Sequence, residues 1–365
     1  MKKILNNKPL LFIILISLIA RFFISFGTGL PWISVDSVNY IIQAKALLNG
    51  GYEYYFPNGY PLIIALFIFI SSLIPLKIGL ILFNIFISTL GVFFIYLISE
   101  KYFTENKIYP LIAAAVVAFY PNQLNYVHFI LTEVPAAFFL ILSLYFFIKD
   151  KTIFSGLAIG IASIIKISLL PAAVLFSLYL FVSRGMNRHA VYFLIFSLLP
   201  LVILSVYGFA VTGEISLTKN SFHNLYLTAG VTDVNNITLS EGLSVYFNYL
   251  SASPVNFLTD RVESFWNLWG FLPAATEGLR ENIFYRLLIG LRFPLLLFGI
   301  YGYMKTGNKE LKVFLILPAL VLTVIHTLTF SGPRFTFPAE PFLIVLGVKG
   351  IEELYNKYFR RQVNT

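Results

Sequence analysis

The chain has 365 residues, of which 58% are hydrophobic and 12% charged, with a formal net charge of +9 and no cysteine. A soluble globule carries about 25% charged residues, so this composition excludes one, and the apolar runs that recur from end to end are typical of a polytopic helical membrane protein. The absence of cysteine excludes disulfides and thiolate chemistry, and the scattered histidines show no zinc-binding spacing.

The hydropathy pattern predicts about ten membrane spans. They are expected at residues 9–29, 78–99, 108–120, 133–149, 152–166, 168–183, 190–211, 283–304, 311–330 and 335–350. Several are shorter than the roughly 20 residues of a full crossing, so we expect them to meet a thinned or cavity-lined region. The fold class predicted is therefore an all-α polytopic membrane protein with a single membrane domain, residues 1–365.

Two longer segments lie outside these spans. Residues 30–77 are expected to form a first outer loop with juxtamembrane helices: one over 37–49, stopped by Gly50 and Gly51, and then the turn PNGYP at 57–61. Residues 212–282 mix polar and apolar pieces, which predicts an extracytoplasmic capping loop that touches the bilayer surface through Trp266 and Trp269.

Positive charge predicts the topology. The apolar segment 62–76 could cross the membrane or lie within it. If it does not cross, one side receives most of the 26 Lys and Arg residues, including every short basic loop, as the positive-inside rule requires. We therefore expect a multi-pass protein with both termini cytoplasmic and 62–76 not crossing. The net charge is explained by topology, and no nucleic-acid partner is expected.

This topology gathers four charged residues at the outer ends of spans: Asp36, Glu133, Lys166 and Arg334. Two carboxylates and two cations at the rim of a cavity could displace a phosphate from an activated carbon. One carboxylate would accept or orient the acceptor's proton, and the cations would neutralise the departing phosphate.

Each of the four also has a structural interpretation. Asp36 could be only the N-cap of its helix, and Glu133 could only complement a helix dipole. Lys166 could extend to the lipid headgroups. Arg334 could be an interfacial anchor or could pair with Glu340 nearby.

Five further residues are candidates for substrate binding. Arg21 and Arg292 lie inside predicted spans and need partners there. His128 belongs to the polar turn that precedes Glu133. Tyr40 and Tyr60 belong to the motifs described next.

The motifs resemble those of the GT-C class of integral-membrane glycosyltransferases, in particular the branch of protein O-mannosyltransferases and lipid A aminoarabinose transferases. An acidic residue in the first outer loop, a Tyr and small residue on a helix, and a P-x-Y-P turn correspond here to Asp36, Tyr40, Ala44 and PNGYP at 57–61. The later motifs of that family correspond to Thr132-Glu133, to the Gly-rich span GLAIGIASIIK ending at Lys166, and to Arg334, Pro338 and Pro341.

The resemblance implies a transferase that moves a sugar from a polyprenyl-phosphate donor to a lipid, glycan or protein acceptor, usually with inversion, with Asp36 as the base. Many relatives are longer at the C-terminus, and some have two adjacent acidic residues where this chain has Asp36-Ser37. We therefore expect no cofactor and do not favour a divalent metal. The alternatives are a lipid-linked sugar flippase or transporter, and a polysaccharide polymerase or ligase. The site is expected to face outward from the cell membrane, in contact with membrane lipids.

Overall fold

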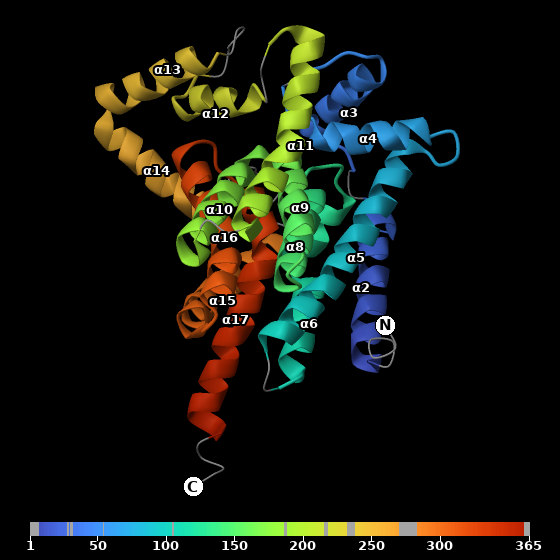
Figure 1. Ribbon diagram of the computed structural model, residues 1–365, viewed down its shortest axis with the longest axis vertical. Helices are drawn as coiled ribbons and strands as arrows, with labels where there is room; N and C mark the ends of the chain where they lie inside the picture. Colours follow the sequence, from blue (N-terminus) through green and yellow to red (C-terminus); the bar gives the residue numbers. More distant parts are fainter. Residues whose placement is uncertain are drawn as a thin grey trace.

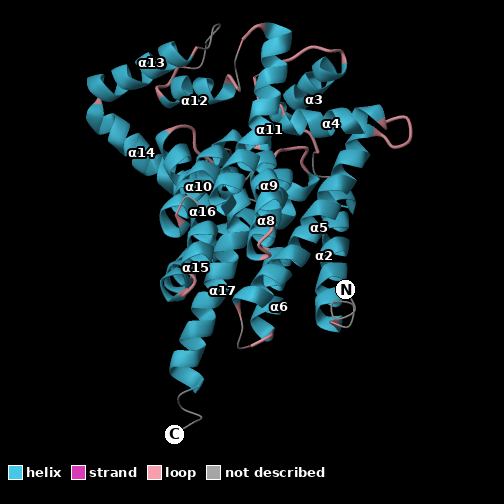
Figure 2. Cartoon of the chain, in the orientation of Figure 1, coloured by secondary structure: helices cyan, strands magenta, loops and turns pink. Residues whose placement is uncertain are grey.

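The computed structural model describes residues 7–27, 29, 32–53, 55–103, 106–185, 188–214, 218–231, 238–269 and 283–360. Most of these residues lie in helices. No strand occurs in these ranges (Figure 2). The α-helices are α2 (Lys8–Gly27), α3 (Val35–Leu48), α4 (Gly59–Phe69), α5 (Leu76–Tyr102), α6 (Ile108–Phe119), α7 (Pro121–Asn125), α8 (Glu133–Ile148), α9 (Thr152–Ile165), α10 (Leu170–Arg184), α11 (Arg188–Thr212), α12 (Asn220–Thr228), α13 (Leu239–Ala252), α14 (Pro254–Trp269), α15 (Ile283–Lys305), α16 (Lys309–Leu328) and α17 (Glu340–Tyr355). Shorter turns are η1 (Tyr126–His128), η2 (Ile167–Leu169), η3 (Pro333–Ala339) and the π-helical turn η4 (Asn356–Arg360).

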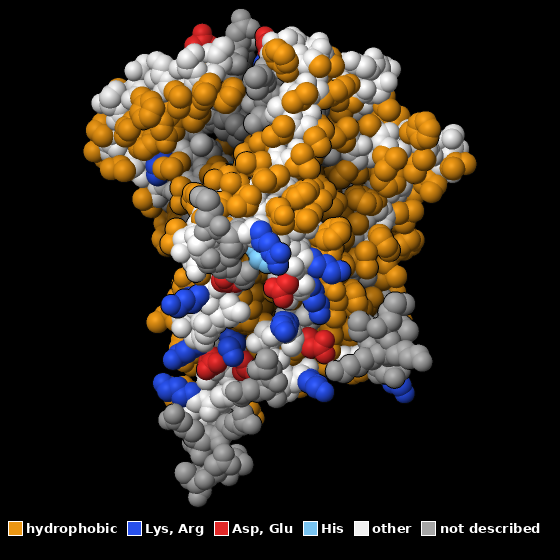
Figure 3. All heavy atoms as spheres, in the orientation of Figure 1, with side chains coloured by type: hydrophobic (Ala, Val, Ile, Leu, Met, Phe, Trp, Pro, Cys, Tyr) orange, Lys and Arg blue, Asp and Glu red, His pale blue; other side chains and the backbone are white. Residues whose placement is uncertain are grey.

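Four helices in the described ranges are long and apolar enough to cross a membrane: α2, α5, α11 and α16, with 20 to 27 residues each. Their outward faces carry large exposed apolar side chains such as Phe12, Phe86 and Val202, as a lipid-facing surface requires. Figure 3 shows hydrophobic side chains over much of the visible face. The prediction of an all-α polytopic membrane protein is confirmed.

Several predicted spans are short helices packed inside the bundle. The 14-residue α9 lies between α8 and α11, and it approaches α11 very closely. A Cβ on Gly160 would come within 2.5 Å of the Ser197 carbonyl oxygen, so only glycine allows this contact. The contact fixes the axis of α9 and therefore the position of Lys166, which follows its last residue.

The first outer loop folds as α3 and α4, which lie across one end of the bundle (Figure 1). α4 has 11 residues, fewer than the roughly 20 that a crossing needs. Gly59 begins α4 against the end of α9, where a Cβ would come within 2.5 Å of the Ile164 carbonyl oxygen. The PNGYP turn is thereby held beside Lys166.

Helices α12, α13 and α14 lie at the same end as α3 and α4 (Figure 1). Within the predicted capping loop, the Thr218 hydroxyl and the Asn220 N–H both donate to the Tyr55 carbonyl, at 2.9 and 2.8 Å. These bonds join α12 to the first outer loop. Trp266 is 42% exposed, whereas Trp269 is 6% exposed and packs in the core. The prediction that Trp269 lies on the bilayer surface is therefore wrong.

The start of α2 and the end of α17 both lie toward the other end of the molecule, on opposite sides of it (Figure 1). In Figure 3 most of the Lys and Arg side chains of the visible face lie in the half of the molecule that contains this end. The described termini therefore share one end, and α3, α4 and α12 occupy the opposite end. Which end faces the cytoplasm stays a prediction.

Helices α15 and α17 run parallel in close contact. A Cβ on Gly302 would clash with the Leu346 carbonyl oxygen, and one on Gly350 with the Phe298 carbonyl oxygen. Small residues allow such backbone proximity in membrane helices. This pair supports η3, which precedes α17 and carries Arg334.

Candidate active site

A pocket of about 560 Å³ lies at the end of the bundle where α8 begins and α9 ends. Its lining comes from α3, the turn before α4, α8, η2, α10, α12, α16 and η3. Asp36, Glu133, Lys166 and Arg334 all line it, although the sequence separates them widely. The structure therefore brings together the four charged residues that the sequence groups on one side.

Asp36 and Arg334 form one ion pair across the pocket mouth. Arg334 Nη1 donates to Asp36 Oδ2 at 2.7 Å, and the two side chains are 24% and 32% exposed. The cap of α3 is Ser34, whose hydroxyl accepts the Ser37 N–H in a capping box. Asp36 is therefore not the N-cap of α3, so the alternative that it serves only as that cap is wrong, and its carboxylate is directed toward Arg334.

The position of Asp36 is fixed by hydrogen bonds on both sides of it. The Ser37 hydroxyl donates to the Ile130 carbonyl at 2.8 Å, and the Ile130 N–H donates to the Trp32 carbonyl at 3.0 Å. These bonds hold the start of α3 against the turn before α8. Asp36 and Glu133 are thus placed by the same contact between two distant segments.

Glu133 and Lys166 form the second ion pair, deeper in the pocket. Lys166 Nζ lies 3.1 Å from Glu133 Oε1, and the side chains are 9% and 3% exposed. The Thr132 hydroxyl donates to Glu133 Oε2 at 3.4 Å instead of capping α8. A buried carboxylate requires such partners, because an unpaired charge in this position is very unfavourable. The pair contradicts the alternative in which Lys166 extends to the headgroups.

The charges of the pocket act on one another. Burial opposes the charge of Arg334, but the carboxylates of Glu133 and Asp36 outweigh it and raise the pKa of Arg334 above its usual value. Burial, Glu133 and Asp36 together raise the pKa of the Tyr40 phenol. Tyr40 is therefore a neutral hydrogen-bonding group here. The two carboxylates and two cations of the ion pairs give the pocket a net charge close to zero.

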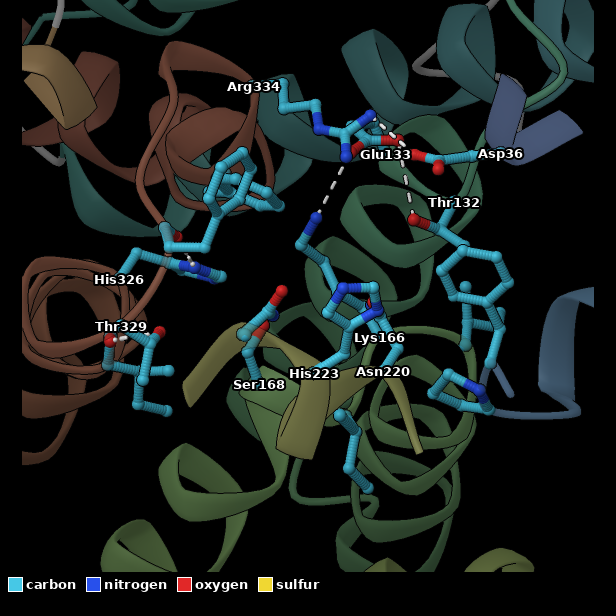
Figure 4. Close-up of a pocket in the computed structure, with 18 of the residues that line it drawn as sticks. Asp36, Thr132, Glu133, Lys166, Ser168, Asn220, His223, His326, Thr329 and Arg334 are labelled. Atoms are coloured by element: carbon cyan, nitrogen blue, oxygen red, sulfur yellow. Dashed lines mark hydrogen bonds and ion pairs between the residues drawn. The ribbon is translucent and has the colours of Figure 1, made fainter. Parts of the chain in front are cut away.

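Phe335 lies between the cations and the opposite wall. Lys166 Nζ and the Arg334 guanidinium carbon lie 5.0 and 4.9 Å from the centre of its ring. The His326 ring stacks on it at 4.1 Å and an angle of 11°. Figure 4 shows the carboxylates and cations on one side of the pocket, with His326 and Thr329 on the other.

The remaining predicted binding residues occupy several places. Tyr40 lines the pocket, and Tyr60 is fully buried behind it, with ring centres 5.3 Å apart. Arg21 does not line the pocket; it is held between helices by Ser88 and the Ala118 carbonyl. His128 is also outside the lining, and its ring lies against that of Phe129, with ring centres 4.1 Å apart and an angle of 38° between the rings.

Arg292 belongs to a separate buried network centred on Glu340. Arg292 Nη2 donates to Glu340 Oε1 at 2.7 Å, and the Asn122 and Gln123 side chains donate to the same carboxylate at 2.6 and 3.1 Å. Arg292 also donates to the Pro333 carbonyl at 3.1 Å. The partner of Glu340 is therefore Arg292, and the alternative pairing of Arg334 with Glu340 is wrong. The network supports the backbone beside Arg334.

Several lining residues are absent from the sequence prediction. Asn220, His223, Asn224 and Leu227 of α12 line the pocket at the i, i+3, i+4, i+7 spacing of one helical face. The Tyr55 hydroxyl lies 3.0 Å from His223 Nδ1. This spacing in the sequence indicates a helix with one face toward the pocket, whereas the prediction for residues 212–282 is a loop. No sequence pattern indicates His326 and Phe335, because their rings come from α16 and η3 and meet only in the folded structure.

No group of three or more His, Cys, Asp or Glu side chains in the described residues could hold a metal ion. Each pocket carboxylate already has a cation beside it. The expected independence from metal remains a prediction.

No known family model matches the chain, and no curated protein sequence matches it. A solved structure with a similar fold is the oligosaccharyltransferase of Archaeoglobus fulgidus, crystallised with a tethered acceptor peptide that contains the NVT sequon. The TM-score is 0.51 at 14% identity, over 99% of this chain and 51% of that one. The chain thus spans about half the length of that enzyme, and at this identity the likeness shows the fold alone, which is the GT-C membrane fold that the motifs predict.

Proposed function

We propose that this protein is a membrane glycosyltransferase that moves a sugar from a polyprenyl-phosphate donor to an acceptor, with inversion at the anomeric carbon. The observation that carries the proposal is the convergence of Asp36, Glu133, Lys166 and Arg334 on one pocket. The shared fold with an oligosaccharyltransferase supports a transferase that acts on an acceptor.

In the proposed reaction, an acceptor hydroxyl attacks the anomeric carbon and forms the new glycosidic bond. The bond from that carbon to the phosphate oxygen breaks, and the electron pair leaves with the polyprenyl phosphate. The proton of the acceptor passes to Asp36, the more exposed of the two carboxylates. Inversion follows from a single displacement.

The cations have a second role in this proposal. Lys166 and Arg334 each form an ion pair with a carboxylate in the structure. Arrival of a phosphate would let both cations share their charge with it, because Arg and Lys bind phosphate oxygens through charge-assisted bonds. The charge that grows on the leaving phosphate would then be stabilised by both cations.

The location supports a reaction at the outer face of the cell membrane. The pocket lies opposite the end where the described termini and the basic side chains gather (Figures 1 and 3). Basic loops are expected in the cytoplasm, so the pocket is expected outside it. The donor lipid would reach the pocket from the membrane.

The decisive experiment is transfer by the purified full chain. Polyprenyl phosphates that carry different radiolabelled hexoses or pentoses are incubated with the protein and with lipid, glycan and peptide acceptors. Loss of label from the lipid with appearance of an inverted glycoside supports the proposal. Movement of intact donor across vesicles without a chemical product would establish a transporter instead, and long glycan products would establish a polymerase or ligase.

A further inference from the structure

His326 presents an unsatisfied hydrogen-bond acceptor beside the pocket. Its Nδ1 lies 3.1 Å from the Phe330 carbonyl oxygen, which can only accept, so this nitrogen carries the hydrogen. In the neutral ring, Nε2 then holds a lone pair and can only accept. Nε2 is buried and has no partner among the described residues.

The surroundings fix this acceptor relative to the ion pairs. The stack on Phe335 holds the His326 ring, and Phe335 contacts Lys166 and Arg334 on the same wall. Ser168 lines the pocket from η2, which packs against α16, the helix of His326. The Ser168 hydroxyl is also buried and has no partner among the described residues. Two unsatisfied polar atoms therefore border one part of the cavity.

We propose that His326 Nε2 and the Ser168 hydroxyl form a subsite that recognises a sugar or acceptor hydroxyl; this rests on the proposed function. Nε2 needs a donor. An ionised phosphodiester and a hydrocarbon chain offer no O–H or N–H, so neither can satisfy it. A hydroxyl can donate to His326 and can also bond to Ser168. The subsite is therefore suited to the transferred sugar or the acceptor, and not to the phosphate.

The chain offers variants that isolate this contact. His326→Phe preserves the aromatic stack but removes the acceptor, whereas His326→Gln restores an amide oxygen near the same place. Ser168→Ala removes only the second hydroxyl and is a milder test of folding. His189→Gln is the matched control, because His189 contacts Thr152 at the end of α9 opposite Lys166.

The first measurement is binding of two lipid probes to the purified full chain: a polyprenyl phosphate and the same lipid carrying a hexose. We expect the affinity gained from the sugar to fall about tenfold in His326→Phe, with binding of the unglycosylated lipid unchanged. His326→Gln should regain part of that affinity. If the sugar-dependent affinity is intact but the acceptor KM rises, the hydroxyl belongs to the acceptor. If both lipids weaken equally, or if neither quantity changes in His326→Phe and Ser168→Ala, the subsite is refuted.

The second measurement uses methyl glycosides that lack both lipid and phosphate, together with their monodeoxy analogues. Wild-type protein should be stabilised thermally by the parent glycoside and less by one particular deoxy analogue. His326→Phe should no longer distinguish the two, because the missing hydroxyl has no partner there. If the wild-type protein binds neither lipid probe, the proposed donor is wrong, but the glycoside measurement still tests the subsite. In that case, no thermal stabilisation of the wild-type protein by any glycoside would refute the subsite.

Discussion

Replacement of Asp36 by Asn separates catalysis from structure. Asn keeps the size of Asp, and Arg334 can still donate to its amide oxygen. The capping box of α3 is made by Ser34 and Ser37, so it is unaffected. The lost ion pair is 24% and 32% exposed, and partly exposed pairs contribute about 1 kcal/mol or less to folding. The variant should therefore insert, fold and bind donor lipid.

Turnover should fall much further than this small change in stability. A positioned base contributes about 10²–10⁴ in rate, which corresponds to about 3–5 kcal/mol of transition-state stabilisation. The assay is single-turnover sugar transfer at matched donor occupancy, so that binding and chemistry are measured separately.

The matched control is Glu353→Gln. Glu353 pairs with Lys349 at 2.9 Å with side chains 31% and 18% exposed, so the pair resembles that of Asp36 in exposure but lies on α17 outside the pocket. It should lose similar stability and no turnover. An Asp36→Asn protein that transfers sugar within about threefold of wild type would refute Asp36 as the base, because a base contributes far more.

Other perturbations test separate parts of the structure. Lys166→Met leaves Glu133 buried without its cation and should lower the free energy of unfolding, measured in detergent, by about 3–5 kcal/mol. Adding Glu133→Gln to this variant should restore most of that free energy, and no recovery in the double variant would contradict the pairing. Burial lowers the pKa of His128 to about 4, so as the pH falls the unfolded chain binds a proton at this histidine before the folded chain does. The free energy of unfolding should therefore fall by about 2 kcal/mol from pH 7 to pH 5. His128→Phe should remove this part of the pH dependence, and an unchanged slope of unfolding free energy against pH in that variant would contradict the prediction. For topology, a cysteine at Asn106 should resist a membrane-impermeant thiol reagent in intact cells while one at Thr238 reacts, and the reverse pattern would invert the predicted orientation.

The sequence predicts that the four charged residues lie on one side of the membrane, and the structure places all four in one pocket at one end of the bundle. Charge and hydropathy specify which span ends share a side, and this brings Asp36, Glu133, Lys166 and Arg334 into the same layer. Charge and hydropathy do not predict which of these residues form ion pairs with one another. Arg334 contacts Asp36 and not Glu340, six residues away, because Arg334 on η3 lines the pocket whereas Glu340 at the start of α17 is buried against Arg292. Such a choice depends on tertiary packing that no local pattern contains.

Arg21 and Arg292 illustrate the same limit. The position of each arginine inside a span predicts that it needs a partner, and most of the partners lie on other helices of the bundle; Arg21 also donates to Ser17 of its own helix. Arg21 bonds to Ser88 and the Ala118 carbonyl, and Arg292 to Glu340. In this protein both arginines predicted to lie inside spans bind buried protein groups, so an arginine in a predicted span does not by itself indicate a substrate site.

The ion pair between Asp36 and Arg334 joins residues 298 positions apart, and this has a consequence for biosynthesis. A growing chain presents Asp36 early, but its partner arrives only after α16 has been made. Domains generally acquire structure from the N-terminus onward during synthesis, and long-range contacts form late. This ion pair therefore cannot form until nearly the whole bundle has entered the membrane, so a translation product arrested before η3 would contain Asp36, the proposed base, without its partner Arg334.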